Sequence, residues 1–205
     1  MEYEGLTQDD LANVRALNRR WLRLRQNDAR CGAPLADKQV EHLAAAPFLL
    51  FSFQEQDQRL WQALLRADGQ QDLLTRTATS SAELRALQAA GLAFLWELVR
   101  RNPYAARVVS GAPLSWCEQL ASLTLVRLLE STADGIVLES RFDDESSLYR
   151  RLLQRGSSAR QETRVFAQIG ALQAMLTSAT LVPYRRFPAA ACGMPQPAEQ
   201  VADKV

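Results

Sequence analysis

Apolar residues recur every three or four positions along most of this chain, the spacing that places side chains on one face of an α-helix. Thr7 followed by Asp10 forms an N-cap signal, and the apolar spacing behind it continues as far as Gly32. These residues predict a first amphipathic helix. The same spacing predicts a second helix over about 36–46 and a third over about 54–67.

Two capping signals mark helices in the second half of the chain. Ser80 with Glu83 forms a capping box in front of a long apolar stripe, which predicts a helix ending near residues 102–103. Ser115 with Glu118 has the same spacing and predicts the start of another helix.

Three more helices and one extended segment are expected after that. Apolar spacing predicts helices over about 123–129, 144–155 and 158–178. Residues 136–138 are Ile-Val-Leu, and β-branched residues favour an extended conformation. We therefore expect a short extended segment near residues 136–141.

These elements predict an all-α fold, an orthogonal multi-helix bundle of about eight helices with that one extended segment. A polar linker over about 68–79 would separate an N-terminal helical half, residues 1–68, from a C-terminal half, residues 80–180. Four of the 8 prolines fall near the end of the chain and predict a flexible tail over 183–205.

The string Gly-Ala-Pro-Leu occurs twice, at residues 32–35 and 111–114. Each copy lies between a longer predicted helix and a shorter one, so the two halves could be pseudo-repeats that pack about a two-fold axis. Because all four residue types are common, chance recurrence is the alternative explanation.

The composition fits a globular protein without a strong overall charge. Of the 205 residues 47% are hydrophobic, which allows a proper core, and the formal net charge is +1. This balance creates no global field toward DNA or an anionic membrane, so contact with a polyanion must come from local clusters. The 3 cysteines lie far apart and form no Cys-x-x-Cys pair, which argues against both a disulfide framework and a zinc ribbon. We therefore expect the protein in the cytoplasm.

No membrane-spanning or targeting segment is expected. The longest apolar run, residues 44–51, contains a proline and is far shorter than the roughly 20 residues that cross a bilayer. The first ten residues are acidic and lead into no apolar stretch, which is unlike a signal peptide.

The usual combinations of catalytic side chains are missing from the sequence. Its 1 histidine, His42, lies on a predicted helix beside apolar residues and is expected to be structural. The acidic cluster at residues 143–145 begins a predicted helix, where carboxylates complement the helix dipole, so we interpret it as a cap rather than a metal site. No phosphate-binding glycine loop occurs. We therefore expect no enzyme activity, no metal site and no cofactor.

The large aromatic residues fit apolar positions. The 4 tryptophans are Trp21, Trp61, Trp96 and Trp116. We expect them to pack in the core, and the alternative is a pocket in a small-molecule-binding protein. Phe48, Phe51 and Phe53 follow Pro47 and are expected in the core, or else on an exposed interaction surface.

An arginine-rich segment is the candidate binding site. Five arginines and a single acid, Glu162, lie between residues 146 and 170, so the local net charge is +4. On two helices joined at residues 156–158, guanidinium groups would suit phosphate oxygens, and the two glutamines could face base edges. The predicted DNA-binding residues are Arg150, Arg151, Arg155, Arg160, Gln161, Arg164 and Gln168. The alternative is a solvated arginine face without a ligand.

Three segments occur in a notable order, LAFLWELVRRNPYAARVV, LSWCEQLASLTLVRLLEST and IVLESRFDDESSLYRRLLQ. In this order and spacing, with Leu-Ala-Ser-Leu-Thr at 120–124 before Arg-Phe-Asp at 141–143, residues 92–176 resemble the FlhD family, the D subunits of the bacterial flagellar master transcriptional activator. A helix pair over 147–176 stands where that family has its DNA-contacting region. The resemblance implies a helical transcription regulator that forms homodimers and joins a second, zinc-containing subunit.

The chain also departs from the FlhD pattern. It has a long additional N-terminal part and a proline-rich tail, and Leu138 stands where some relatives have a cysteine that could link a dimer. Because the chain lacks a four-cysteine set, it does not resemble the zinc-containing subunit. The resemblance therefore carries over only residues 156–168 as the expected DNA contact.

Two functions compete at this point. The preferred one is a cytoplasmic helical transcription regulator, homo-oligomeric and joined to a protein partner subunit, that contacts DNA phosphates through the arginine-rich helix pair. The alternative is a helical protein–protein interaction adaptor without DNA binding or catalysis. The near-zero net charge favours the adaptor, as does the stripe of Arg15, Arg19 and Arg23 on the first predicted helix, which suits acidic partners as well as phosphates.

Overall fold

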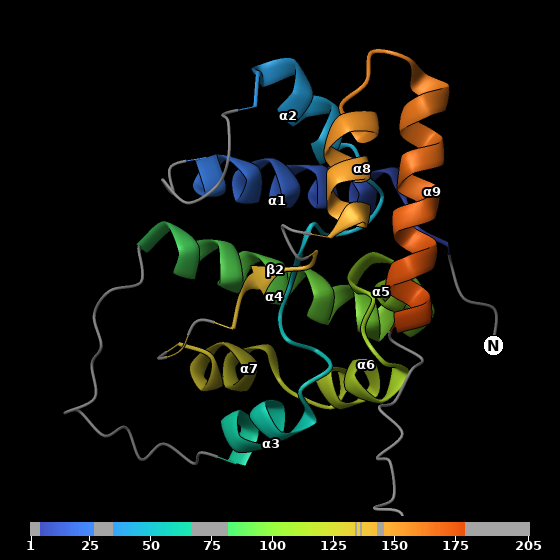
Figure 1. The fold of residues 1–205 in the computed structure, drawn as a ribbon. Helices are drawn as coiled ribbons and strands as arrows, with labels where there is room; N and C mark the ends of the chain where they lie inside the picture. Colours follow the sequence, from blue (N-terminus) through green and yellow to red (C-terminus); the bar gives the residue numbers. More distant parts are fainter. Residues whose placement is uncertain are drawn as a thin grey trace, which may run out of the picture.

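The computed structural model describes residues 5–26, 35–66, 82–133, 135, 137–142 and 146–178. It confirms the all-α prediction: within these residues the chain forms helices and one small two-stranded sheet (Figure 1). The elements, in order, are α1 (Gln8–Gln26), α2 (Asp37–Ala44), β1 (Phe51–Ser52), α3 (Gln58–Arg66), α4 (Ala82–Arg101), α5 (Pro103–Ser110), α6 (Leu114–Ala121), α7 (Leu125–Ser131), β2 (Glu139–Ser140), α8 (Ser147–Gly156) and α9 (Gln161–Ser178).

Helices α1 and α4 form the centre of the bundle. They pack against each other, α2 packs on α1, and α5, α6 and α7 pack on α4 (Figure 1). The apolar spacing that predicted these helices explains the contact, because Val14 and Trp21 on α1 and Leu87 and Leu95 on α4 are all buried. Residues from both expected halves of the chain belong to this one hydrophobic cluster.

The predicted extended segment is confirmed, and it has a partner that the sequence pattern did not reveal. β2 pairs antiparallel with β1, with Phe51 opposite Ser140. Phe48, Phe51 and Phe53 around β1 are fully buried, so the core interpretation of these phenylalanines is confirmed and the exposed one is wrong. β1 has only two residues and both are buried, so it gives no alternation of apolar and polar positions in the sequence.

A buried asparagine fixes the segment before β1 to α1. Asn18 lies inside the core, where its Nδ2 donates to the carbonyl oxygen of Phe48 at 2.8 Å. Its Oδ1 accepts from the backbone N–H of Leu50 at 2.9 Å. Since buried backbone groups must find partners, this side chain takes the place of a further strand beside the short β1.

The predicted cap of the first helix is confirmed. Thr7 Oγ accepts from the backbone N–H of Asp10 at 3.1 Å, and the Asp10 carboxylate accepts from the backbone N–H of Thr7 at 2.9 Å. The same carboxylate forms an ion pair with Arg101 of α4 at 2.5 Å. Burial alone would raise the pKa of Asp10, but the hydrogen bonds from Thr7 and the Arg101 guanidinium together hold that pKa below its ordinary value.

Replacing Asp10 with asparagine is expected to lower the free energy of unfolding by about 1–3 kcal/mol at neutral pH. Because the folded-state pKa lies below the unfolded value of about 3.9, the contribution of the carboxylate is complete above that value. It is lost as the pH falls through the folded-state pKa. Urea unfolding of wild type and variant from pH 7 downward should therefore show a difference that narrows only below about pH 4. A difference that stays constant into acid would contradict this role.

Several helix boundaries differ from the sequence expectation. The long fourth helix ends where predicted, but α5 follows at once, because Asn102 caps it through the N–H groups of Tyr104 and Ala105 and Pro103 fits the first helical position. Ser115 does not cap a helix: α6 has already begun behind Pro113. The third helix begins at Gln58 rather than near 54, since the chain turns at Gln54, which has φ 53.

Parts of some predictions lie outside the described residues. These are most of the first Gly-Ala-Pro-Leu copy, the linker, the Ser80 cap, the acidic cluster at 143–145 and the tail over 183–205. The second copy lies in the structure as the connection between α5 and α6. There Gly111 ends α5 with φ 66, and a Cβ on it would lie 2.5 Å from Met175 of α9, so only glycine fits.

Candidate interaction surface on helices α8 and α9

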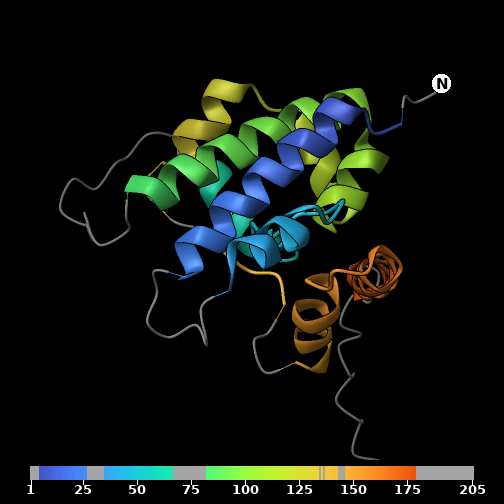
Figure 2. The same cartoon turned by 90° about the horizontal axis from the view of Figure 1, so that it is seen from above.

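Helices α8 and α9 form a pair on one side of the bundle (Figure 2). Ser146 caps α8 by accepting from the backbone N–H of Tyr149 at 3.1 Å. The other end of α8 approaches α2 closely, because a Cβ on Gly156 would lie 3.2 Å from Leu43. His42 of α2 contacts the carbonyl oxygen of Ser157 through Nδ1 at 3.1 Å, which agrees with a structural histidine. The pair is thus held to the bundle at the turn between its helices.

The structure brings two of the seven predicted DNA-binding residues together. Arg151 and Arg155 lie one helical turn apart on the flank of α8 that faces α9, and both are exposed. Arg150 is also exposed, but about 100° away around the helix. The arginines of α8 therefore do not form one continuous row.

The other predicted residues lie on or near α9 with different roles. Arg164 is half-buried, and its Nη1 donates to the carbonyl oxygens of Ser158 and Ala159 at 2.8 and 2.9 Å. This guanidinium therefore stabilises the turn between α8 and α9. Arg160 and Gln161 are exposed at the start of α9, whereas Gln168 is half-buried.

A groove of about 410 Å³ runs between α8 and α9. Its walls combine small residues, apolar residues and two positive charges, and the lining residues are Leu148, Arg151, Leu152, Arg155, Phe166, Ala167, Gly170, Gln173, Ala174 and Thr177. No carboxylate of the described residues lines it, so Arg151 and Arg155 give the groove a positive potential.

The exposed face of α9 is apolar. The prediction for this segment rested on its arginines and did not include this face. Phe166 is 76% exposed, Ile169 is 55% exposed and Val165 is 43% exposed. Residues 165–178 contain no charged side chain at all. The opposite side of the helix, at Ala171 and Met175, is buried. In the sequence, residues 165–178 carry no charge and have apolar residues on every side of the predicted helix, and this pattern could have predicted a second apolar face.

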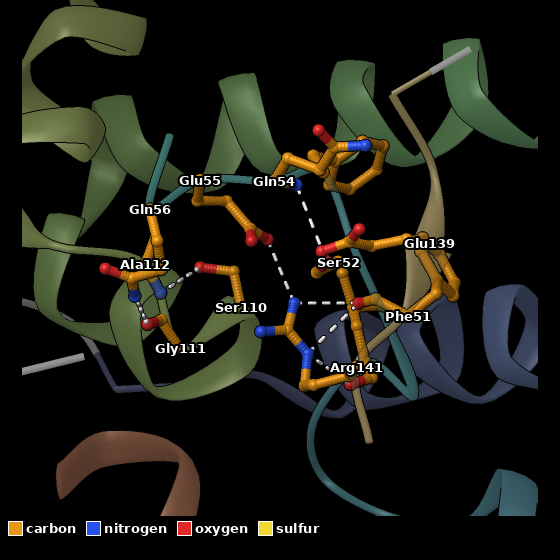
Figure 3. A network of polar contacts seen from close by, with 12 residues as sticks. Phe51, Ser52, Gln54, Glu55, Gln56, Ser110, Gly111, Ala112, Glu139 and Arg141 are labelled. Carbon is orange, nitrogen blue, oxygen red and sulfur yellow. Dashed lines mark hydrogen bonds and ion pairs between the residues drawn. The ribbon is translucent and has the colours of Figure 1, made fainter. Parts of the chain in front are cut away.

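A second cavity, of about 590 Å³, lies between β1, β2 and α9, and its floor is a buried ion pair (Figure 3). The Arg141 guanidinium donates to the carbonyl oxygens of Leu49 and Phe51 and forms an ion pair with Glu55 at 2.9 Å. At the rim, Ser52 Oγ donates to Glu139 at 3.2 Å. These contacts join the loop after β1 to β2, so the arrangement of Arg141 is structural.

The other candidates for chemistry among the described residues have the following surroundings. Burial raises the pKa of the Cys117 thiol to about 12, so this cysteine stays protonated and is a poor nucleophile. In the part of the chain that the structure describes, no three His, Cys, Asp or Glu residues come together as metal ligands. Trp21, Trp61 and Trp116 are buried, in agreement with core packing. None of the described helices has the length and apolar character needed to span a membrane.

Comparison with models of known protein families, with curated proteins and with solved structures finds no match. The resemblance to the FlhD family stays a prediction from the sequence. The function must therefore be inferred from the surface that α8 and α9 form.

Proposed function

We propose that this protein is a helical protein-interaction module, and that the groove between α8 and α9 binds the apolar face of a helix of a partner protein. The supporting observation is Phe166, which is 76% exposed at the edge of a groove that Arg151 and Arg155 also line. Large aromatic residues next to arginines are the usual energetic centre of protein interfaces. We also propose that the protein acts in the cytoplasm, the compartment expected from its cysteine pattern.

The shape of the groove fits a helix. Its floor is made of Ala167, Gly170 and Ala174, which lie three and four residues apart along α9. Gly170 is exposed, and a Cβ on it would meet nothing within 4 Å. A glycine inside a helix costs about 1 kcal/mol relative to alanine, and no contact among the described residues accounts for Gly170. The close approach of a second helix would explain a glycine at this position, because small residues let two helix backbones come near each other.

The charge of the groove defines the partner further. Arg151 and Arg155 lie on one wall with no acidic residue opposite them among the lining residues. A partner helix with carboxylates beside its apolar face would place them against these guanidinium groups. Arginine forks suit carboxylates in two-point contacts, which also fix the orientation of the partner. We therefore propose an amphipathic, acidic helix as the partner segment.

DNA binding is the second candidate, because Arg150, Arg155 and Arg160 are exposed and could contact phosphates. The resemblance to the FlhD family also supports it. Arg164 is a weaker candidate for a phosphate contact, since its Nη1 is bonded to the turn. Exposed Val165 and Ile169 on α9 are unusual for a helix that meets a polyanion.

Selection of helical peptides displayed on phage tests the groove. We expect the selected peptides to have apolar residues at helical spacing with Glu or Asp beside them. Phe166→Glu should weaken their binding about 30-fold or more, as loss of a central aromatic contact does. The double change R151E/R155E should weaken it about 10-fold, because attraction becomes repulsion. The matched control R59E/R85E alters two exposed arginines of α3 and α4 and should bind normally.

The same proteins separate the two candidate functions. R150A/R160A changes arginines that do not line the groove, so peptide binding should be unaffected. With a labelled DNA duplex, that variant should reduce the slope of log affinity against log salt by about 2 if DNA is the ligand. Selected peptides that bind Phe166→Glu as well as wild type would contradict the groove. Duplex binding that depends on Arg150 and Arg160 would support the second candidate instead.

A further inference from the structure

The cavity between β1, β2 and α9, which we call the Arg141 cavity, has the size of a small-molecule site (Figure 3). Its volume of about 590 Å³ falls within the range of roughly 300–1,000 Å³ that is usual for ligand pockets. Its lining is mixed, since Phe142, Leu148 and Met175 are apolar and several other residues are charged. Apolar walls with a few convergent polar groups are the usual composition of such a pocket.

The fold holds Arg141 in place, yet one nitrogen of its guanidinium has no partner among the described residues. The side chain is 8% exposed, and its Nε and Nη2 donate to backbone carbonyl oxygens and to Glu55. No described residue accepts from Nη1, which lies beside Gly111 in the lining: a Cβ on Gly111 would be 3.1 Å from it. Because buried donors are nearly always paired, Nη1 is positioned to meet an acceptor oxygen of a molecule in the cavity.

Three carboxylates in the lining determine the charge that a ligand should carry. The Glu55 side chain is 2% exposed and bonds to Arg141 through Oε1, while no described residue donates to Oε2. Glu139 and Asp57 are exposed, and each uses one oxygen, Glu139 for Ser52 Oγ and Asp57 for a backbone N–H. Three carboxylates and one guanidinium give the described lining residues a formal charge of −2. The cavity therefore favours a cation.

We propose that the Arg141 cavity binds a small organic cation that also carries an acceptor oxygen, the chemistry of a free basic amino acid such as lysine. The ligand's carboxylate would accept from Nη1 of Arg141, and its α-ammonium group would donate to Oε2 of Glu55. Its side-chain cation would pair with Glu139 and Asp57, and its methylene groups would pack on the apolar residues. A simple amine would leave Nη1 without an acceptor, and a simple anion would be repelled by the excess of carboxylates.

This ligand site goes beyond the proposed function, because different charged residues form the two sites. Arg151 and Arg155 line the groove, whereas Arg141 and the three carboxylates line the cavity. The two linings share Leu148 and Ala174, so variants of the charged residues test each site separately. A ligand of about ten non-hydrogen atoms should bind with a dissociation constant on the order of 100 μM.

Equilibrium dialysis of the full chain against radiolabelled L-lysine tests the site. The double change D57N/E139Q should raise the dissociation constant at least 10-fold, because it neutralises two carboxylates that attract the cation. Asparagine caps a helix about as well as aspartate, so the start of α3 should be kept. The matched control E97Q/E130Q neutralises two exposed carboxylates outside the lining and should bind lysine like wild type.

Two analogues test which groups of the ligand are recognised. Norleucine lacks the side-chain ammonium group and cadaverine lacks the carboxylate, and each should compete at least 10-fold more weakly than lysine. Arg141→Lys keeps the positive charge but removes Nη1, so it should weaken the binding of lysine and leave that of cadaverine unchanged. A purely structural role of Arg141 would not change the two affinities differently. Circular dichroism will verify that the variants keep their helices.

Three results would overturn the inference. The first is no retention of labelled lysine or arginine at a protein concentration of about 300 μM. The second is equal lysine affinity for D57N/E139Q and wild type, and the third is competition by norleucine or cadaverine as strong as that by lysine. None of these results would contradict the groove, because D57N/E139Q should still bind the selected helical peptides while Phe166→Glu does not.

Discussion

Arg141→Ala is expected to lower the free energy of unfolding by about 3–5 kcal/mol, the usual cost of leaving a buried charge without its partner. The side chain of Arg141 is 8% exposed and that of Glu55 is 2% exposed, and the two form an ion pair at 2.9 Å. Removal of the guanidinium would leave the Glu55 carboxylate buried without a counterion. It would also remove the donors to the carbonyl oxygen of Phe51 (Figure 3) and to that of Leu49.

Urea unfolding followed by circular dichroism measures this effect. Arg141→Lys keeps the positive charge but lacks the planar fork, so it should recover only part of the lost stability. The matched control is Arg15→Ala, which breaks the ion pair between Arg15 and Glu41. The Arg15 side chain is 50% exposed and the Glu41 side chain is 36% exposed. The unfolding midpoint of this variant should change little, because exposed ion pairs contribute little. Equal effects at Arg141 and Arg15 would disprove the structural role of the buried pair.

Trp61→Ala is the second change with a large expected effect, a loss of about 3–5 kcal/mol. Trp61 is 1% exposed and joins α3 to α6 through an edge-to-face contact with Trp116, with ring centroids 5.2 Å apart. Its Nε1–H donates to the carbonyl oxygen of Phe53 at 3.0 Å. The substitution would create a cavity and leave that buried oxygen without a donor.

Trp61→Phe separates the two contributions. Phenylalanine keeps most of the aromatic packing but has no N–H, so the expected loss is smaller, about 1–3 kcal/mol for the unsatisfied carbonyl oxygen. Urea midpoints for the two variants should therefore fall in the order alanine, phenylalanine, wild type. If Trp61→Ala matched wild type, the contact between α3 and α6 would not stabilise the fold.

The candidate surface shows what a count of charges can and cannot predict. The local charge of +4 singled out the pair of helices α8 and α9, and DNA binding by this pair stays a prediction. However, a count of arginines does not distinguish Arg151, which lines the groove, from Arg164, which bonds to carbonyl oxygens of its own turn. That difference depends on the turn geometry between α8 and α9. Similarly, Val165 and Ile169 look like core residues by type, and only the position of α9 at the edge of the bundle leaves them exposed.

The all-α fold, the cap at Thr7 and Asp10, and the extended segment that becomes β2 could be predicted from local signals, because helix periodicity, capping and β-branching act between near neighbours. Three features could be read only from the folded chain: the pairing of β2 with β1, the ion pair of Arg141 with Glu55, and the exposed side of α9. Residues that are distant in the chain make these contacts. Their energy comes from burial and charge pairing in space, which no local pattern encodes.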